Sequence, residues 1–214
     1  IYGMIAKLLS ESNISYIKWD MNRSITECYS IAYPADQQGE IFHRYILGVY
    51  DLYERLTSAF PEVLFESCAS GGGRFDPGML YYAPQGWVSD DSDAVERLKI
   101  QYGTSMCYPL SSMGSHVSVI PNHQVFRNTP LHTRANVAYF GTFGYELDLN
   151  KLSDAEIEEV KAQIRFMKEY RELLQFGTFY RLKSPFNGNE TVWMVVSEDK
   201  SKALVGYYRV LNGV

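Results

Sequence analysis

Residues 14–23 read ISYIKWDMNR, a stretch rich in β-branched and aromatic residues that leads into an acidic residue, Asp20. Such a run is typical of a short buried strand, so we expect a strand over residues 14–19. Residues 1–12 before it have the pattern of the end of a helix. The stretch therefore predicts a strand that follows a helix and presents a carboxylate at its carboxyl end.

Helices and strands continue to alternate after this stretch. Helical spacing of apolar residues predicts a helix over residues 40–60, which Pro61 ends, and a second strand over 63–65. A third short strand is expected over residues 86–88. Later elements are expected in this order: a helix from Asp93 to about Tyr102, a strand near 113–119, a helix from about Leu131, a strand near 141–147 and a helix from Ser153 to Gly177. Two of these helices are predicted to begin with a capping box, Asp93 with Glu96 and Ser153 with Glu156.

This order of elements defines the predicted fold. Strands that alternate with helices imply parallel βαβ units, and about five strands are too few to close an eight-stranded barrel. We therefore expect an α/β fold in which residues 1–177 form the second half of a (β/α)8 TIM barrel. Beyond Gly177 the apolar pattern changes to period two, so residues 178–214 are predicted to begin a C-terminal antiparallel β domain.

Composition excludes several kinds of partner. The chain of 214 residues is 46% hydrophobic and 21% charged, as in a folded protein, and no apolar run is long enough to cross a membrane. Its net charge is −5 and it has no cluster of Lys and Arg, so we expect no nucleic-acid partner. A small neutral ligand fits this composition better.

The cysteines and histidines argue against disulfides and metals. Cys28, Cys68 and Cys107 are odd in number and widely spaced, which favours a reducing compartment such as the cytoplasm. The four histidines lack the spacing of metal ligands, so no metal site is expected.

Candidate catalytic residues lie where the predicted strands end, because active sites of such barrels gather at the carboxyl ends of the strands. Three segments qualify: residues 18–23 (KWDMNR), 66–74 (ESCASGGGR) and 87–93 (WVSDDSD). The first and third offer carboxylates from different strands.

Two carboxyl groups about 5 to 5.5 Å apart are what retaining hydrolysis of a glycosidic bond needs. We expect Asp20 and Asp90 to supply them, facing one cleft from neighbouring strands. Lys18 lies two residues before Asp20, hence on the same side of the strand, where its charge would keep Asp20 ionised as the nucleophile. An isolated Asp after a strand is more often a cap or turn residue, but the setting KWDMN favours catalysis.

Four acidic residues compete for the acid/base role, since Asp90, Asp91, Asp93 and Glu96 lie within seven positions. Asp93 and Glu96 are assigned to the predicted capping box, and Asp91 should point away from Asp90 on an extended backbone. Asp90 is therefore preferred, with Asp91 as the alternative. Neighbours such as Trp87 and an ionised Asp20 would help Asp90 to hold its proton near neutral pH.

The glycine run at residues 70–74 is a weaker signal. No Lys-Ser/Thr pair follows it, so we do not expect a phosphate loop, and its bare backbone suits the close approach of a sugar. From the residues alone, Cys68 is equally a small buried hydrophobic residue and Arg74 equally a structural ion-pair partner.

Longer segments carry a resemblance to a known family. Residues 16–27 (YIKWDMNRSITE), 66–105 (ESCASGGGRFDPGMLYYAPQGWVSDDSDAVERLKIQYGTS) and 113–127 (MGSHVSVIPNHQVFR) resemble the bacterial and fungal α-galactosidases of glycoside hydrolase family 36. The resemblance runs over about residues 1–180. It implies a (β/α)8 barrel flanked by β domains and retaining hydrolysis of terminal α-linked galactose from oligosaccharides such as raffinose and melibiose. It implies no cofactor, and the full-length enzyme could be a homo-oligomer.

The resemblance also implies roles for individual residues. Asp20 maps to the nucleophile and Asp90 to the acid/base. The expected substrate-binding residues are Lys18, Trp19, Asn22, Cys68, Gly71, Gly72, Arg74 and Trp87. Gly86 and Phe126 depart from the family pattern and are expected to alter the wall of the cleft only.

The family's N-terminal β domain and first barrel strands have no counterpart in this sequence, so we expect the chain alone to be inactive. Alternatives with the same two carboxylates are an α-N-acetylgalactosaminidase and a galactosyl transferase of the raffinose-synthase kind. A non-catalytic carbohydrate-binding fragment is an alternative from another class. The space beside the sugar's 2-position, near Cys68, would discriminate among the enzymes, and KWDMN favours the hydrolase.

Overall fold

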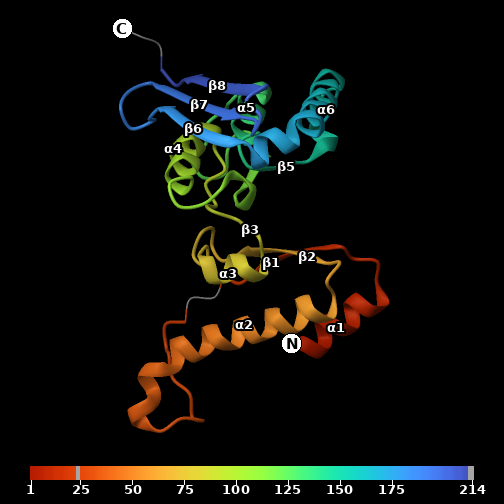
Figure 1. Cartoon of the computed structure of the whole chain (residues 1–214). Helices are drawn as coiled ribbons and strands as arrows, with labels where there is room; N and C mark the ends of the chain where they lie inside the picture. The colour runs from red at the N-terminus through yellow and green to blue at the C-terminus, as the bar shows by residue number, and fades with distance from the viewer. Residues whose placement is uncertain (23–24, 212–214) are drawn as a thin grey trace. The chain divides into compact units, whose positions relative to one another are not determined.

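The computed structural model of the chain describes residues 1–22 and 25–211 and divides into two compact units, residues 1–86 and 87–214. We call them the N-terminal and C-terminal units. The last three positions of the predicted β domain lie outside the described residues. In chain order the elements are α1 (Tyr2–Glu11), β1 (Tyr16–Asp20), η1 (Ala35–Glu40), α2 (Ile41–Ala59), β2 (Leu64–Cys68), α3 (Pro77–Tyr82), β3 (Gln85–Gly86), α4 (Ala94–Thr104), η2 (Leu110–Ser112), β4 (Gly114–Ser118), α5 (Leu131–Ala138), β5 (Thr142–Glu146), η3 (Leu149–Lys151), α6 (Asp154–Phe176), β6 (Thr178–Lys183), β7 (Glu190–Val196) and β8 (Ala203–Arg209) (Figure 1).

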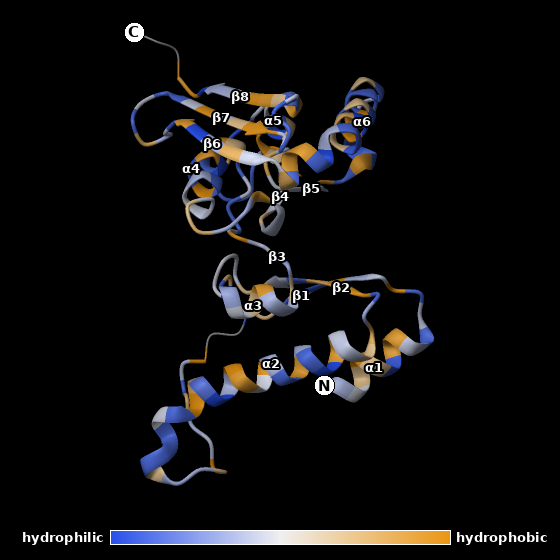
Figure 2. Ribbon diagram, viewed as in Figure 1, coloured by the Kyte–Doolittle hydropathy of each residue, from blue (hydrophilic) through white to orange (hydrophobic). Residues whose placement is uncertain are grey.

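The N-terminal unit is a parallel sheet, in the order β1-β2-β3, packed against helices. Figure 1 shows α1 and α2 on one side of β1 and β2. In Figure 2 apolar and polar positions alternate around α2, as expected for a helix with one face in the core. Tyr53 and Leu56 on that face are fully buried and cluster with Phe65 of β2. Burial of this apolar stripe holds the sheet on α2.

Two local features of this unit differ from the sequence-based expectation. Strand β2 covers Leu64–Cys68 rather than 63–65, so Glu66 and Cys68 belong to the strand instead of following it. Residues Pro77–Tyr82 form helix α3, an element for which no prediction was made from the sequence. The Asp76 carboxylate accepts a hydrogen bond from the Met79 backbone N–H (3.0 Å), and Pro77 occupies the start of the helix.

The C-terminal unit combines a parallel strand pair, β4 and β5, with helices α4 to α6 and the antiparallel sheet β6-β7-β8. The predicted mixed α/β class with an antiparallel sheet after Gly177 is therefore confirmed. A half-barrel also requires the sheet β1-β2-β3 to continue into the pair β4-β5, and this continuation stays a prediction. The domain boundary at Gly177 stays a prediction as well.

Packing joins the antiparallel sheet to the helices of the same unit. Trp193 of β7 is fully buried, and its ring lies 5.3 Å from the ring of Phe140 after α5. The Tyr208 hydroxyl of β8 donates to the Asn136 carbonyl of α5 (2.7 Å). Between α6 and β6, a Cβ on Gly177 would lie 2.5 Å from a methyl carbon of Val195, so the close approach requires glycine.

One of the two predicted capping boxes is confirmed. Ser153 and Glu156 exchange side-chain and backbone hydrogen bonds at the start of α6. The prediction for α4 is wrong in part: Asp93 does accept from the backbone N–H of Glu96 (3.1 Å), but the Asp93 N–H donates to Asp91 Oδ1. The Glu96 carboxylate pairs with Arg127 instead (3.2 Å).

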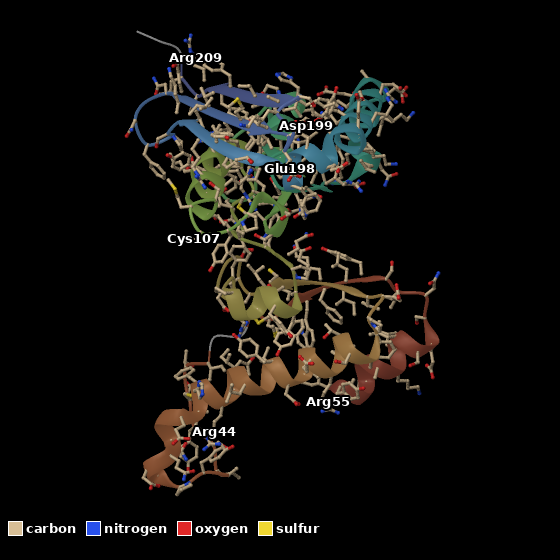
Figure 3. The ribbon with its side chains drawn as sticks, in the orientation of Figure 1. Arg44, Arg55, Cys107, Glu198, Asp199 and Arg209 are labelled. Carbon is tan, nitrogen blue, oxygen red and sulfur yellow. The ribbon has the colours of Figure 1, made fainter. Side chains whose placement is uncertain are left out.

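The cysteines are free thiols: Cys28 is half-buried, Cys68 is buried and Cys107, labelled in Figure 3, is exposed. In residues 1–22 and 25–211, no set of three or more His, Cys, Asp or Glu side chains is grouped as a metal site would need. Within the same described residues, none of the helices combines the length and apolar character of a membrane span.

Candidate active site

The carboxyl end of β1 presents Asp20, and the alternation of the strand decides which residues share its face. Tyr16, Lys18 and Asp20 lie on one face, because side chains of a strand alternate. Trp19 lies on the other face, where its ring packs 4.9 Å from the ring of Tyr53 in the core. The structure therefore does not bring the side chain of Trp19 to Asp20, and its contribution is to hold β1 on α2.

Strand β2 completes this face in parallel register. Lys18 is paired with Glu66, and Asp20 with Cys68. The Lys18 ammonium lies 3.5 Å from Glu66 Oε1, and Glu66 is only 1% exposed. Sequence reasoning missed Glu66, because it placed the end of the strand at residue 65.

Glu66 is held on its other oxygen as well. The Tyr16 hydroxyl and the Gln85 amide (3.0 Å) both donate to Glu66 Oε2. Burial, followed by the contact with Glu66, raises the pKa of the Tyr16 phenol above its usual value, so Tyr16 remains a donor. Oε1 is a buried oxygen whose nearby partner is the Lys18 charge. This arrangement anchors the ammonium of Lys18 on the face of Asp20.

Cys68 is buried beside the same carboxylate. Burial raises the pKa of its thiol to about 11, and the negative charge of Asp20 acts in the same direction, while a backbone contact with Gly71 and the charge of Lys18 oppose it. The thiol is therefore neutral at neutral pH, which argues against a role as a nucleophile.

Asn22 connects Asp20 to the glycine-rich loop. Its Nδ2 donates to Asp20 Oδ2 (2.9 Å), and its Oδ1 accepts from the Ser70 backbone N–H (2.6 Å). Gly71, the next residue of the loop, has φ of +74°, a conformation that favours glycine. Gly72 is exposed and forms an isolated bridge with Ala69.

Arg74 holds the loop against β1. Its guanidinium donates to the Met21 carbonyl and lies 5.8 Å from the ring of Tyr45. These contacts give Arg74 a structural part in placing the residue that follows Asp20. These contacts are with a backbone carbonyl and a ring rather than with a carboxylate, so they do not correspond to the ion pair that the sequence offered as an alternative for Arg74.

The segment after β3 presents Asp90 in the C-terminal unit. Asp90 is exposed, and its Oδ1 accepts a hydrogen bond from Trp87 Nε1 (3.1 Å). Trp87 itself is 4% exposed, and its ring lies 4.5 Å from the His116 ring. A buried indole thus orients an accessible carboxylate.

The neighbouring carboxylates have structural partners. Asp91 Oδ1 accepts from the Asp93 N–H (3.1 Å), and Asp93 Oδ2 caps α4 and pairs with Arg127. Glu96 pairs with Arg127 and with Lys99 (3.6 Å). These contacts favour Asp90 over Asp91 as the candidate acid/base.

The expectation that Asp20 and Asp90 come from neighbouring strands is wrong, because β2 lies between β1 and β3 in the sheet and Asp90 follows β3. Strand β3 ends at Gly86, earlier than expected. The two carboxylates belong to different units, and their meeting across one cleft stays a prediction.

Comparison with known proteins identifies the family. The sequence profile of the Melibiase family matches residues 1–177. The chain therefore belongs to the melibiase family. It is 59% identical over 211 residues to the α-galactosidase AgaA of Geobacillus stearothermophilus, and 53% identical to Mel36A of Lactobacillus acidophilus. Each match covers 99% of this chain and 29% of the relative, so the chain spans less than a third of the length of these proteins.

Solved structures agree with these sequence matches. The crystal structure of AgaA, a GH36 α-galactosidase, superposes with a TM-score of 0.97 at 58% identity, over 100% of this chain and 30% of that chain. Variants of AgaA have been solved in complex with raffinose and with stachyose. The resemblance to glycoside hydrolase family 36 that the motifs predict is thereby confirmed.

Proposed function

We propose that this chain is the part of a retaining α-galactosidase that carries both catalytic carboxylates, Asp20 as nucleophile and Asp90 as acid/base. The observation that carries the proposal is the end of β1, where Asn22 and Cys68 adjoin Asp20 and the Lys18–Glu66 pair shares its face. Family membership supports the same assignment.

The proposed reaction is a double displacement. Asp20 attacks the anomeric carbon while Asp90 gives its proton to the leaving oxygen, and a galactosyl-enzyme forms. Asp90 then removes a proton from water, which attacks the anomeric carbon and releases Asp20. Asn22 fits this cycle, since its amide N–H holds the attacking carboxylate in one orientation.

The proposed substrates are α-galactoside oligosaccharides, in line with the raffinose and stachyose complexes of AgaA variants. Galactose would be held by residues around the two carboxylates, namely Lys18, Asn22, Cys68, Gly71, Gly72 and Trp87. Trp19 and Arg74 are proposed to act indirectly: Trp19 packs on Tyr53 and holds β1 on α2, and Arg74 binds the Met21 carbonyl. The proposal includes no cofactor, and the free thiols support a reducing compartment such as the cytoplasm.

We further propose that residues 1–177 form the second half of a (β/α)8 barrel, and that residues 178–214 begin a C-terminal β domain. The parallel pairs among β1 to β3 and between β4 and β5 support this arrangement. Catalysis then requires the longer enzyme, because remote contacts to the sugar help to position the anomeric carbon.

The test is an assay of the full-length enzyme on raffinose and on an aryl α-galactoside, with product configuration followed by NMR. Full-length enzyme here means the longer polypeptide that carries this chain, or AgaA with this chain in place of its matching segment. We expect release of α-galactose first, and no turnover by the 214-residue chain alone. Inverted product, or preference for an N-acetylgalactosaminide, would reject the proposed function.

A further inference from the structure

We infer that Arg97 is a positioning residue for Asp90, an inference that rests on the acid/base role proposed above. Arg97 lies in the first turns of α4 and is only 2% exposed. Its guanidinium donates to the backbone carbonyls of Ser89 (2.8 Å) and Asp91 (2.8 Å). These two residues flank Asp90, so one side chain holds the backbone on both sides of the carboxylate.

A third hydrogen bond fixes this segment to the sheet. Arg97 Nη1 donates to the carbonyl of Gly114, the first residue of β4 (3.0 Å). The planar guanidinium therefore links the segment that bears Asp90 to a strand 17 residues further along than Arg97 itself. Three donors in fixed directions set position as well as orientation, which a single ammonium does not do.

Arg97 also supports the side chain of Asp90 through Trp87. The guanidinium carbon lies 4.4 Å from the centroid of the Trp87 ring, which also lies 4.5 Å from the His116 ring. Trp87 Nε1 in turn donates to Asp90 Oδ1 (3.1 Å). A cation over an indole ring is a favourable contact, especially when both groups are desolvated. The backbone and the carboxylate of Asp90 are thus held by the same buried charge.

The charge of Arg97 persists at the pH of the reaction. Burial lowers the pKa of Arg97 to about 10, partly offset by the charges of Glu146, Asp91 and Asp90. Arg97 is therefore protonated near neutral pH. Burying a charge is costly unless hydrogen bonds replace its water shell. For Arg97, the carbonyls of Ser89, Asp91 and Gly114 provide that replacement. Loss of the guanidinium should consequently release the segment.

This geometry predicts a selective kinetic defect. Proton transfer depends on where Asp90 lies, whereas attack by Asp20 on a substrate with an activated leaving group needs no proton. In the full-length enzyme we expect Arg97→Lys to lower kcat/KM on raffinose by about 100-fold, because a displacement of about 1 Å has an effect of that order. On a dinitrophenyl α-galactoside the loss should stay below about fivefold.

Arg134→Lys is the matched control. Arg134 is likewise buried (4% exposed) and donates to backbone carbonyls, those of Thr129 (3.0 Å) and Ser118. Burial lowers its pKa in the same direction. These carbonyls do not flank Asp90, so we expect Arg134→Lys to change kcat/KM on both substrates by one common factor.

Two further measurements separate positioning from folding. Arg97→Gln keeps amide donors without the charge and should show the same substrate-selective loss. Adding Arg97→Lys to Asp90→Ala should cause no further loss of kcat/KM on raffinose, since the group to be positioned is gone. Equal losses on both substrates, or failure of both Arg97 variants to fold while Arg134→Lys folds, would overturn the inference. A wild-type enzyme without activity on either substrate would instead reject the proposed function.

Discussion

The two regions that carry the candidate catalytic carboxylates are held in different ways. At Asp20 the supporting groups are side chains on paired strands, with Lys18 beside Glu66 and Cys68 beside Asp20 in register. At Asp90 the support comes from a helix, where Arg97 binds backbone carbonyls on both sides of the carboxylate. At the end of β1, side chains on one face of the strand pair surround Asp20. In the segment after β3, hydrogen bonds to backbone carbonyls hold the residues on both sides of Asp90.

This difference has a functional reason under the proposed mechanism. A nucleophile must keep one orientation while it forms and breaks a covalent bond, which a strand end with an amide donor provides. An acid/base must exchange its proton with the leaving group and with water, and so needs exposure. Asp90 is exposed while its backbone is held from the buried side. Variants around Asp20 should therefore lower kcat/KM on all substrates alike, whereas variants around Asp90 should lower it more on substrates whose leaving group needs a proton.

The largest effect is expected for Asp20→Asn in the full-length enzyme. No group remains to form the galactosyl-enzyme, so kcat on raffinose and on an aryl α-galactoside should both fall by at least about 10⁴-fold. The measurement is steady-state kinetics with each substrate. Asp51→Asn is the control, because Asp51 is an exposed aspartate of α2 that pairs with Arg55 (3.7 Å). Rescue of Asp20→Asn by azide with retained configuration would exchange the two roles.

Asp90→Ala should show a large effect that depends on the substrate. Raffinose needs protonation of its leaving group, so kcat/KM on it should fall by about 10² to 10⁴-fold. On a dinitrophenyl α-galactoside the first step survives, and added azide should restore turnover by replacing the base-assisted water. Asp91→Ala, which removes an acceptor of the Asp93 N–H, serves as the control and should affect both substrates equally. Azide rescue of Asp91→Ala instead would make Asp91 the acid/base.

Glu66→Gln tests the strand-end region with a smaller expected effect. The amide can still accept from Tyr16 and Gln85, but Lys18 loses the negative charge that lies 3.5 Å away. If Lys18 holds a sugar hydroxyl, KM should rise by about tenfold on every α-galactoside while kcat changes little, as for one charged hydrogen bond. Glu190→Gln, which removes a half-buried carboxylate that pairs with Arg209 (2.9 Å), is the control. An unchanged KM in Glu66→Gln would remove Lys18 from substrate binding.

The sequence predicted the strand-end region better than the segment around Asp90. Period-two alternation is local, so Lys18 and Asp20 could be placed on one face from the sequence alone. Glu66 was missed because the ESC segment looks like the polar end of a strand, yet it continues the pairing with β1. Helix α3 was missed although Asp76 and Pro77 carry a start signal, because the helix has only six residues and follows the glycine run directly.

Arg97 illustrates what local patterns cannot show. In the sequence it is one charged residue of a helix whose predicted start is correct, and a charged residue on a helix is usually exposed. Its burial depends on the Gly114 carbonyl and on the Trp87 ring, which only the tertiary fold brings to it. The capping pattern at Asp93 was misleading for a similar reason, because Arg127 from a later segment takes the Glu96 carboxylate.

The smallest expected effects compare one hydrogen bond in each region. Asn22 donates to Asp20 Oδ2 (2.9 Å) and Trp87 donates to Asp90 Oδ1 (3.1 Å), so each carboxylate has a side-chain N–H on one oxygen. A hydrogen bond to a charged group contributes about 1.5 to 3 kcal/mol and one to a neutral group about 0.5 to 1.5 kcal/mol. Asn22→Ala should therefore lower kcat/KM on raffinose and on the dinitrophenyl galactoside by a similar factor, about 10 to 100-fold.

Trp87→Phe, which keeps an aromatic ring beside Arg97, should lower kcat/KM on raffinose by about three- to tenfold and have less effect on the activated substrate. The ratio of the two substrates' kcat/KM, measured for each variant, is the readout. If this ratio changed more in Asn22→Ala than in Trp87→Phe, the proposal that Asn22 serves the nucleophile and Trp87 serves the acid/base would be contradicted.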